Sequence, residues 1–240
     1  MVPDPAAVKP FYEAVLGWTF TEPDDAFGGY VMALKGEAPV AGMGPQADGG
    51  RTAWTMYFAS DDADAAAAGV RAAGGTVLRD PDDVGPLGRM FVADDPTGAR
   101  FGVWQAGTFP GSAVSNEPGS LIWEDLRSTE PDAAREFYAA VFGHEYSPMD
   151  MASPDYMTFA TAGDDRPRGG MGGMMGAEGV GSHWLLYFSV DDLEESLAAA
   201  TAHGGAVPIP PFETPFGPMA GITDPSGATV WLVQTPPESA

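Results

Sequence analysis

The pentapeptide Asp95-Pro96-Thr97-Gly98-Ala99 returns near the end of the chain as Asp224-Pro225-Ser226-Gly227-Ala228. Each copy separates two short apolar runs, which in the first copy are residues 90–93 and 100–105. Proline fixes φ at the first turn position, glycine supplies a positive φ, and an aspartate side chain can hydrogen-bond the turn backbone. The pattern predicts two β-hairpins, each of which closes one of two long repeats.

The same spacing recurs throughout the chain, at an offset of about 126 to 130 residues. Because the matches occur in the same order in both halves, they indicate an internal duplication. The matching segments are residues 11–17 and 137–143, Tyr30 and Tyr156, 42–44 and 170–172, 54–58 and 184–188, 61–62 and 191–192, and 74–75 and 204–205.

The composition limits the classes of function. The 240 residues carry a net charge of −23, and Lys9 and Lys35 are the lysines. A strongly acidic chain is unsuited to nucleic acid or to an anionic membrane surface. There is no cysteine, which excludes disulfides and thiolate chemistry. No apolar run approaches the length of a membrane span and no signal peptide is evident, so we expect a cytoplasmic protein.

Each long repeat contains two smaller units with the order β-α-β-β-β. Apolar residues at helical spacing predict the helices, and Gly17 and paired glycines mark their ends. A Gly-, Pro- and Ser-rich segment divides the chain into a first module of residues 1–106, a linker of residues 107–119 and a second module of residues 120–236. The predicted helices cover residues 4–16, 62–71, 131–142 and 192–203, and the predicted strands include residues 18–21, 30–35, 40–43, 53–59, 76–78, 121–126 and 183–190.

The two modules differ at their beginnings. The second module opens with the apolar run of residues 121–126, whereas the first has only Met1-Val2-Pro3 before its helix. We therefore expect that the first strand of the first module is missing, through a late start codon or through trimming of the chain.

The motif Phe-Tyr-x-x-Val-Leu-Gly at residues 11–17, its copy at 137–143, Val190-Asp191-Asp192 opening a helix, and the two Asp-Pro-x-Gly turns resemble the vicinal oxygen chelate superfamily. This is the glyoxalase, bleomycin-resistance and extradiol dioxygenase group, and the chain is most similar to its two-module actinobacterial glyoxalase-like members. The resemblance implies an α+β fold of tandem modules, in which paired βαβββ units form a half-open barrel around a cavity.

Metal-dependent members of this group place His or Glu on the first, fifth and last strands of a module. The corresponding positions here are Trp123 on the opening strand, Thr55 and Leu185 on the fifth strands, and Gly102 and Trp231 on the last strands. None of these side chains is a ligand for a divalent cation. The resemblance therefore predicts no metal site and no cofactor.

His183 is the histidine that we expect to face a cavity, because it lies two residues before Leu185 on one strand. A hydrogen-bonding role and a metal-ligand role both remain open for it, and its candidate partners are Asp125 on the Trp123 face of its strand and Glu124 on the opposite face. Asp125 could instead brace the turn that follows. The candidate acids or bases for catalysis are His183, Tyr57 and Tyr187.

Strand alternation predicts an inward face that is rich in aromatic residues. Such a face suits a flat, hydrophobic or aromatic ligand, although the tryptophans could also simply fill the barrel. Arg100 could pair with an acidic ligand group or with a neighbouring Asp, and Met43, Met171, Met174 and Met175 could face ligand or pack internally. The predicted ligand-binding residues are Thr55, Tyr57, Arg100, Trp104, Trp123, Asp125, His183, Leu185, Tyr187 and Trp231.

The sequence favours a metal-independent protein that binds a small hydrophobic or aromatic molecule, as resistance proteins of this group do. The alternative is a glyoxalase-, dioxygenase- or hydroxylase-like enzyme acting on a small aromatic or carbonyl metabolite. Both a monomer and a homodimer are compatible with fused modules. The motifs do not decide whether the protein is an enzyme.

Overall fold

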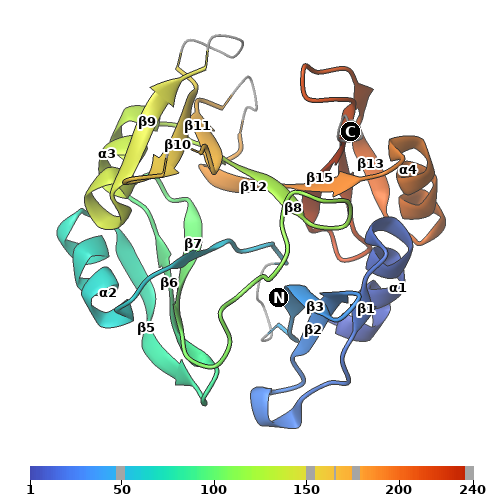
Figure 1. The fold of residues 1–240 in the computed structure, drawn as a ribbon, viewed down its shortest axis with the longest axis horizontal. Coiled ribbons are helices and arrows are strands. Elements are labelled where there is room, and N and C mark those ends of the chain that lie inside the picture. The colour runs from blue at the N-terminus through green and yellow to red at the C-terminus, as the bar shows by residue number, and fades with distance from the viewer. Residues whose placement is uncertain (47–51, 150–154, 165, 175–178, 236–240) are drawn as a thin grey trace. The chain divides into compact units, whose positions relative to one another are not determined.

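The computed structural model describes residues 1–46, 52–149, 155–164, 166–174 and 179–235 (Figure 1). Four α-helices and fifteen strands lie in these ranges. The helices are α1 (Pro5–Leu16), α2 (Ala63–Ala72), α3 (Pro131–Phe142) and α4 (Leu193–Ala202), with a 3₁₀ turn η1 (Asp25–Phe27). The strands are β1 (Thr19–Phe20), β2 (Val31–Lys35), β3 (Ala38–Met43), β4 (Tyr57–Ala59), β5 (Thr76–Val84), β6 (Gly88–Asp94), β7 (Arg100–Ala106), β8 (Leu121–Arg127), β9 (His144–Pro148), β10 (Met157–Thr161), β11 (Gly169–Gly172), β12 (His183–Val190), β13 (Ala206–Phe212), β14 (Met219–Thr223) and β15 (Thr229–Gln234).

The four helices begin and end close to where the sequence predicts. Asp4, Asp62 and Asp192 are N-cap residues whose carboxylates accept hydrogen bonds from the first turns of α1, α2 and α4. Gly17 and Gly143 end α1 and α3 in the left-handed conformation, with φ of 68° at both positions. The duplicated helix motif therefore carries its own stop signal.

The sheets confirm the repeated βαβββ arrangement. One sheet has the strand order β4-β7-β6-β5, and another has the order β13-β14-β15-β12-β8-β11-β10-β9. The strands that flank each predicted turn, β6 with β7 and β14 with β15, pair antiparallel. β4 and β12 then pair parallel with the last strand of their own hairpin. β1, β2 and β3 form a three-stranded sheet, and an isolated parallel bridge joins Val2, before α1, to Pro45, just after β3.

The chain forms two compact units that interleave the repeats. Unit 1 contains residues 1–54, 111–122 and 186–240, and unit 2 contains residues 55–110 and 123–185. Each unit thus combines the first half of one sequence copy with the second half of the other. The expected modules, residues 1–106 and 120–236, describe the repeat in the sequence and stay a prediction. The boundaries of the two compact units fall at other residues.

Each unit has an aromatic core beneath a pair of helices. In unit 2, α2 and α3 lie side by side (Figure 1), and Phe101, Leu126 and Phe137 are buried at their contact with the sheets. In unit 1, Phe11 of α1 and Trp18, which follows the end of that helix, are buried. Burial of one such side chain contributes about 1.5–3 kcal/mol.

The residues that alternate with the predicted inward-facing positions along the strands pack beneath the helices. Phe101, Phe188 and Leu232 are at most 2% exposed. Phe58 and Trp184 are partly buried against the core of unit 2. The alternation of the strands therefore sends the opposite positions, including Trp104 and Trp231, to the other face.

The Asp-Pro-x-Gly turn does more than reverse the chain, because its aspartate is buried. In unit 1, Asp224 Oδ1 accepts hydrogen bonds from Ser226 N at 2.8 Å, Ser226 Oγ at 2.7 Å and Ala228 N at 2.9 Å. Asp224 Oδ2 accepts a bond of 2.9 Å from the hydroxyl of Tyr12, and Trp54 Nε1 donates to the same hydroxyl at 3.0 Å. The turn of the second copy is thereby bonded to the helix of the first copy.

Unit 2 repeats this arrangement in a looser form. Asp95 Oδ1 accepts bonds from Thr97 N, Thr97 Oγ1 and Ala99 N, and Trp184 Nε1 donates to the Tyr138 hydroxyl at 3.0 Å. Burial raises the pKa of Asp95, and its hydrogen-bond donors, Tyr138 among them, lower it. Asp95 Oδ2 nevertheless has no hydrogen-bond partner within bonding geometry in the described ranges.

Two strands differ in length from the prediction. The run of residues 53–59 forms a strand only at Tyr57–Ala59. β5, expected at residues 76–78, extends to Val84 because two register irregularities against β6 accommodate Pro81 at the edge of the sheet. No helix in the described part of the chain combines the length and the apolar character needed to cross a membrane.

The difference between the two Tyr–Asp contacts predicts unequal effects of removing each hydroxyl. Tyr12→Phe leaves Asp224 Oδ2 and Trp54 Nε1 without their partner and should lower the free energy of unfolding by about 2–3 kcal/mol. Tyr138→Phe should cost less, because Asp95 Oδ2 is already outside bonding geometry. Urea unfolding of the two variants measures both values, and an equal or larger loss for Tyr138→Phe would contradict this account.

Candidate functional site

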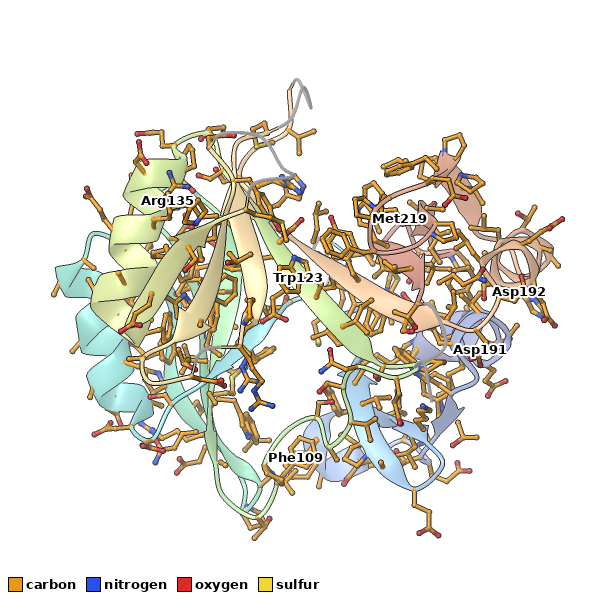
Figure 2. The ribbon with its side chains drawn as sticks, turned by 45° about the horizontal axis from the view of Figure 1, so that its top comes forward. Phe109, Trp123, Arg135, Asp191, Asp192 and Met219 are labelled. Atoms are coloured by element: carbon orange, nitrogen blue, oxygen red, sulfur yellow. The ribbon has the colours of Figure 1, made fainter. Side chains whose placement is uncertain are left out.

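β8 presents two chemically different faces in unit 2. Leu126 is fully buried in the core on one face, and Glu124 shares that face. Trp123, Asp125 and Arg127 point to the other face. Figure 2 shows Trp123 projecting from β8. The predicted separation of Glu124 from Asp125 onto opposite faces is thus observed.

Asp125 is the centre of a closed hydrogen-bond network on that face. Its carboxylate is 3% exposed, and Oδ1 accepts bonds from Trp123 Nε1 at 2.9 Å and from the Tyr156 hydroxyl at 2.5 Å. Oδ2 accepts a bond of 2.6 Å from Arg127, whose guanidinium lies 5.3 Å from the centre of the Tyr156 ring. Trp123 Nε1 also reaches the Tyr156 hydroxyl, at 3.1 Å. We call these four residues the Asp125 network.

The repeated Gly-Met-Gly motif explains how Tyr156 reaches the network. Gly170 lies directly beneath Tyr156, and a Cβ atom at this position would overlap the tyrosine hydroxyl and approach Asp125 Oδ1. The first copy has the same relation, because a Cβ atom at Gly42 would overlap the hydroxyl of Tyr30. The two matches found in the sequence, Tyr30 with Tyr156 and Gly42 with Gly170, therefore reflect one repeated contact between a tyrosine ring and a glycine.

The charge of the Asp125 carboxylate is balanced by groups within the network. Burial is the main cause that raises the pKa of Tyr156, and Asp125 raises it further. The phenol therefore stays protonated and donates to the carboxylate, while Arg127 compensates the carboxylate charge. The described bonds of the Asp125 side chain go to Trp123, Tyr156 and Arg127, and the suggestion that it braces the following turn stays a prediction.

The residues do not fit a metal of the kind that the family resemblance implies. Position 123 holds an indole, and the one nearby carboxylate, Asp125, is bonded by three side chains. Positions 55, 185, 102 and 231 provide Thr, Leu, Gly and Trp. Among the residues described, no group of three His, Cys, Asp or Glu side chains is placed to hold an ion. We therefore derive no chemistry through a metal.

Unit 1 contains a separate aromatic surface, made by Tyr187, Trp231 and Phe212. Tyr187 is buried and stacks on Trp231 with ring centres 5.6 Å apart and an angle of 25°. Phe212 meets Trp231 edge-on at 6.1 Å and is 45% exposed. This arrangement leaves a partly exposed aromatic surface of the kind that flat ligands stack on.

The predicted residues of the first module lie around β4 and β7 in unit 2. Tyr57 is 44% exposed, and its ring lies over Gly102. Trp104 donates from Nε1 to the Phe109 carbonyl at 2.9 Å and lines a pocket of about 290 Å³. Arg100 forms a bidentate ion pair with Asp94, the neighbouring-Asp alternative, at 2.9 and 3.2 Å. Thr55 is half-buried. Of these residues, Tyr57 and Trp104 are the ones that offer ring surface.

His183 and Leu185 lie on β12 in unit 2. Both are half-buried. His183 Nδ1 lies 2.8 Å from the carbonyl oxygen of Gly181, which accepts a hydrogen bond from Nδ1–H. In the neutral ring the lone pair is then on Nε2. His183 therefore has the tautomer that could act as a hydrogen-bond acceptor or base.

The methionines divide according to burial. Met43 and Met171 are buried, and Met171 belongs to the core of unit 2. Internal packing, the second of the two alternatives, is therefore what the structure shows for these two residues. Met174 is half-buried, and Met175 lies outside the described residues.

Sequence reasoning gave no site role to three residues that define these surroundings, namely Tyr156, Arg127 and His144. Tyr156 and Arg127 complete the Asp125 network, and the duplicated Tyr and Gly positions were the signal that could have found the tyrosine. His144 is 6% exposed, and burial lowers its pKa to about 4. Burial, the main cause, raises the pKa of Glu124 to about 7, Arg168 lowers it, and Asp125 adds a smaller raising effect.

Replacement of Gly170 by Ala should disrupt the Asp125 network. The new methyl group displaces Tyr156, leaving Asp125 with fewer donors, and we expect a loss of about 2–4 kcal/mol in the free energy of unfolding. Gly181→Ala is the matched control, because a Cβ atom there meets no atom within 4 Å. Denaturant unfolding compares the two, and similar stabilities would show that Tyr156 does not need the space above Gly170.

The buried imidazole of His144 predicts a loss of stability in acid. Because its folded pKa of about 4 lies below the ordinary value of 6.5, the unfolded chain takes up the proton first as the pH falls. Between pH 6.5 and pH 4 the wild type should lose about 3 kcal/mol relative to His144→Phe. Unfolding measured at several pH values checks this, and parallel curves for the two proteins would contradict it.

Glu124 predicts the opposite slope. Its folded pKa of about 7 exceeds the ordinary value of 4.5, so its stabilising contribution is complete below pH 4.5 and disappears as the pH rises through 7. The wild type should therefore lose stability relative to Glu124→Gln across this interval. The same unfolding series in the Glu124→Gln background separates this effect from that of His144, and a constant difference would sink the assignment.

The chain resembles known proteins over nearly its whole length. It is 39% identical over 242 residues to "Putative glyoxylase CFP32" of Mycobacterium tuberculosis, covering 98% of this chain and 92% of the relative. It is 36% identical over 248 residues to "Anthracycline biosynthesis protein DnrV" of Streptomyces peucetius, covering 97% and 90%.

Solved structures at low identity share the fold. The Mn(II)-bound glyoxalase of Novosphingobium aromaticivorans matches with a TM-score of 0.67 and 19% identity, covering 97% of this chain and 79% of that chain. The 2,3-dioxygenase LapB of Pseudomonas sp. KL28 matches with a TM-score of 0.63 and 17% identity, covering 99% and 91%. The family model described as "Glyoxalase/Bleomycin resistance protein/Dioxygenase superfamily" matches residues 1–103 and 121–232. The chain therefore belongs to the glyoxalase, bleomycin resistance protein and dioxygenase superfamily.

Proposed function

We propose that this protein binds a small hydrophobic or aromatic compound without a metal ion. The observation that carries the proposal is the Asp125 network, in which a tryptophan, a tyrosine and an arginine bond the buried carboxylate that lies two residues from the position of a metal ligand. A superfamily member with this donor set retains the fold but offers ring surfaces in place of chelating groups.

Exposed ring surface supports an aromatic ligand. Trp231 stacks on Tyr187 in unit 1, and Phe212 contributes an exposed ring to the same surface. In unit 2, Trp123 is half-buried and its N–H is held by Asp125, which fixes the orientation of the ring. A flat ligand gains about 0.5–1.5 kcal/mol from each such ring contact beyond the area that it buries.

The relatives favour a polycyclic ligand. DnrV, at 36% identity, is named as an anthracycline biosynthesis protein, and anthracyclines are flat and aromatic. We extend from that name to this chain only the ligand class, a fused-ring aromatic compound.

A fluorescence titration tests the binding proposal. 1,8-Dihydroxyanthraquinone should quench the tryptophan emission in a saturable titration, and Trp231→Leu in unit 1 or Trp123→Leu in unit 2 should weaken binding at its own surface at least roughly fivefold through the lost ring contact. Phe216→Leu, an exposed aromatic residue outside both surfaces, is the control. Purified protein should contain far less than one metal ion per chain. Stoichiometric Fe, Mn, Ni or Zn, or binding unaffected by both tryptophan variants, would contradict the proposal.

An enzymatic function is the second candidate. The observation that favours it is the 39% identity to a relative named as a glyoxylase, and the geometry that would serve it is the fixed tautomer of His183. In this reading His183 Nε2 acts as a base, with Tyr57 of the same unit as the acid. Turnover of catechol or of a dicarbonyl compound that is abolished by His183→Gln, at unchanged stability, would support the enzyme over the binding protein.

A further inference from the structure

The orientation of the Trp123 ring depends on where the Tyr156 hydroxyl is held. Trp123 Nε1 lies 2.9 Å from Asp125 Oδ1 and 3.1 Å from the Tyr156 hydroxyl, which itself bonds the same carboxylate oxygen at 2.5 Å. Tyr156 lies just before β10, outside the pairs described between β10 and its neighbours β9 and β11. Strand pairing therefore does not by itself fix the backbone from which this tyrosine ring projects.

The residue before Tyr156 is held from two sides. Arg135 Nη1 donates a hydrogen bond of 3.0 Å to the carbonyl oxygen of Asp155, and Asp155 Oδ2 accepts a bond of 3.0 Å from the backbone N–H of Gly173. Arg135 lies on α3 (Figure 2), and Gly173 directly follows β11. We call Arg135, Asp155 and Gly173 the Asp155 clamp. Because the Asp155 carbonyl belongs to the planar peptide group that leads into Tyr156, the clamp holds the backbone at that tyrosine in place.

The Arg135 side chain is suited to hold this carbonyl. It is largely buried, and its other terminal nitrogen, Nη2, bonds the carboxylate of Asp132, one turn earlier on α3. A planar guanidinium that is bonded through both terminal nitrogens has a fixed plane. Asp132 is exposed, and an ion pair with an exposed partner contributes little to stability. What matters for the surroundings of Tyr156 is therefore the bond from Arg135 to the Asp155 carbonyl.

The first sequence copy provides an internal comparison, because it lacks all three members of the clamp. In the repeat, Arg135 corresponds to Lys9, Asp155 to Gly29 and Gly173 to Pro45. Lys9 Nζ lies 3.5 Å from the Thr21 carbonyl, while the glycine has no carboxylate and the proline has no backbone N–H. The corresponding helix and strands, α1, β2 and β3, form without these bonds. The fold therefore does not need the clamp, which points to a task that is specific to the second copy.

We propose that Arg135 is a positioning residue for the ring surface of Trp123, and that it acts through Asp155 and Tyr156. The inference rests on the proposed function, since it concerns the ligand surface of unit 2. The contacts run from α3 through the Asp155 carbonyl and the Tyr156 hydroxyl to the indole N–H of Trp123. All of these residues belong to unit 2.

Positioning of the ring improves binding because it is completed before the ligand arrives. A side chain that is already ordered in the free protein does not lose its rotational freedom when the ligand binds. The Trp123 surface therefore depends on Arg135 for part of its affinity. The Trp231 surface lies in unit 1 and involves none of the clamp residues, so its affinity is independent of Arg135.

The first test follows the indole N–H signals in NMR spectra of the isotope-labelled protein without ligand. Arg135→Met removes the donors and keeps the apolar stem. It should shift and broaden the signal of Trp123, which is identified by its loss in Trp123→Leu. The signal of Trp184, whose N–H is bonded to Tyr138 on α3, should stay in place. Lys9→Met, the matched change in the first copy, should move neither signal. An unmoved Trp123 signal, or an equal shift of Trp184, would overturn the proposal, because the arginine would then only stabilise the helix.

The second test titrates 1,8-dihydroxyanthraquinone into variants that retain one ring surface each. In the Trp231→Leu protein, Arg135→Met should weaken binding at least roughly threefold, the effect of ordering one side chain. In the Trp123→Leu protein, the same change should leave the affinity as it was. Unchanged affinity in the Trp231→Leu protein, or an equal loss in both proteins, would overturn the proposal. A wild type that does not bind the dye would contradict the proposed function, and the indole signals would still decide whether Arg135 holds the Trp123 ring.

Discussion

The hydrogen bond between the Tyr12 hydroxyl and the buried carboxylate of Asp224 is the contact on which the arrangement of the chain depends. Asp224 holds its own turn with one oxygen and the helix of the other sequence copy with the second. A buried carboxylate costs several kcal/mol unless its oxygens are bonded. The residues that satisfy it are therefore fixed together, and three separate motifs of the sequence, Phe-Tyr, Trp-x-x-Tyr-Phe and Asp-Pro-x-Gly, become parts of one structural unit.

The same requirement decides the chemistry of Asp125. This carboxylate lies on the same strand face as position 123, two residues further along, but Trp123, Tyr156 and Arg127 bond it within the protein. Displacing these donors would cost more than one charge-assisted hydrogen bond, each worth about 1.5–3 kcal/mol. An ion would have to repay that cost with a single carboxylate as its anchor. The network in unit 2 and the aromatic surfaces of the two units thus favour recognition of a ligand by shape and ring contact.

Local sequence signals predicted the helices, the hairpins and the outward-facing core residues, because caps, glycine stops and strand alternation act over a few residues. They could not predict that Tyr12 bonds to Asp224 and not to Asp95, since both turns match the motif equally well. The Asp125 network was missed for a related reason: Arg127 and Tyr156 are 29 residues apart in the chain, and only the strand register brings them together. The role of Gly170 became clear only once the ring above it was placed.

The claim that the Asp125 carboxylate is bonded by donors of the protein and not by a metal ion is most directly tested by anomalous diffraction from crystals soaked in manganese. The account predicts an intact Asp125 network, with Trp123 and Tyr156 bonded to the carboxylate and no manganese peak beside it. A manganese peak bonded to Asp125, with Tyr156 displaced, would contradict the account.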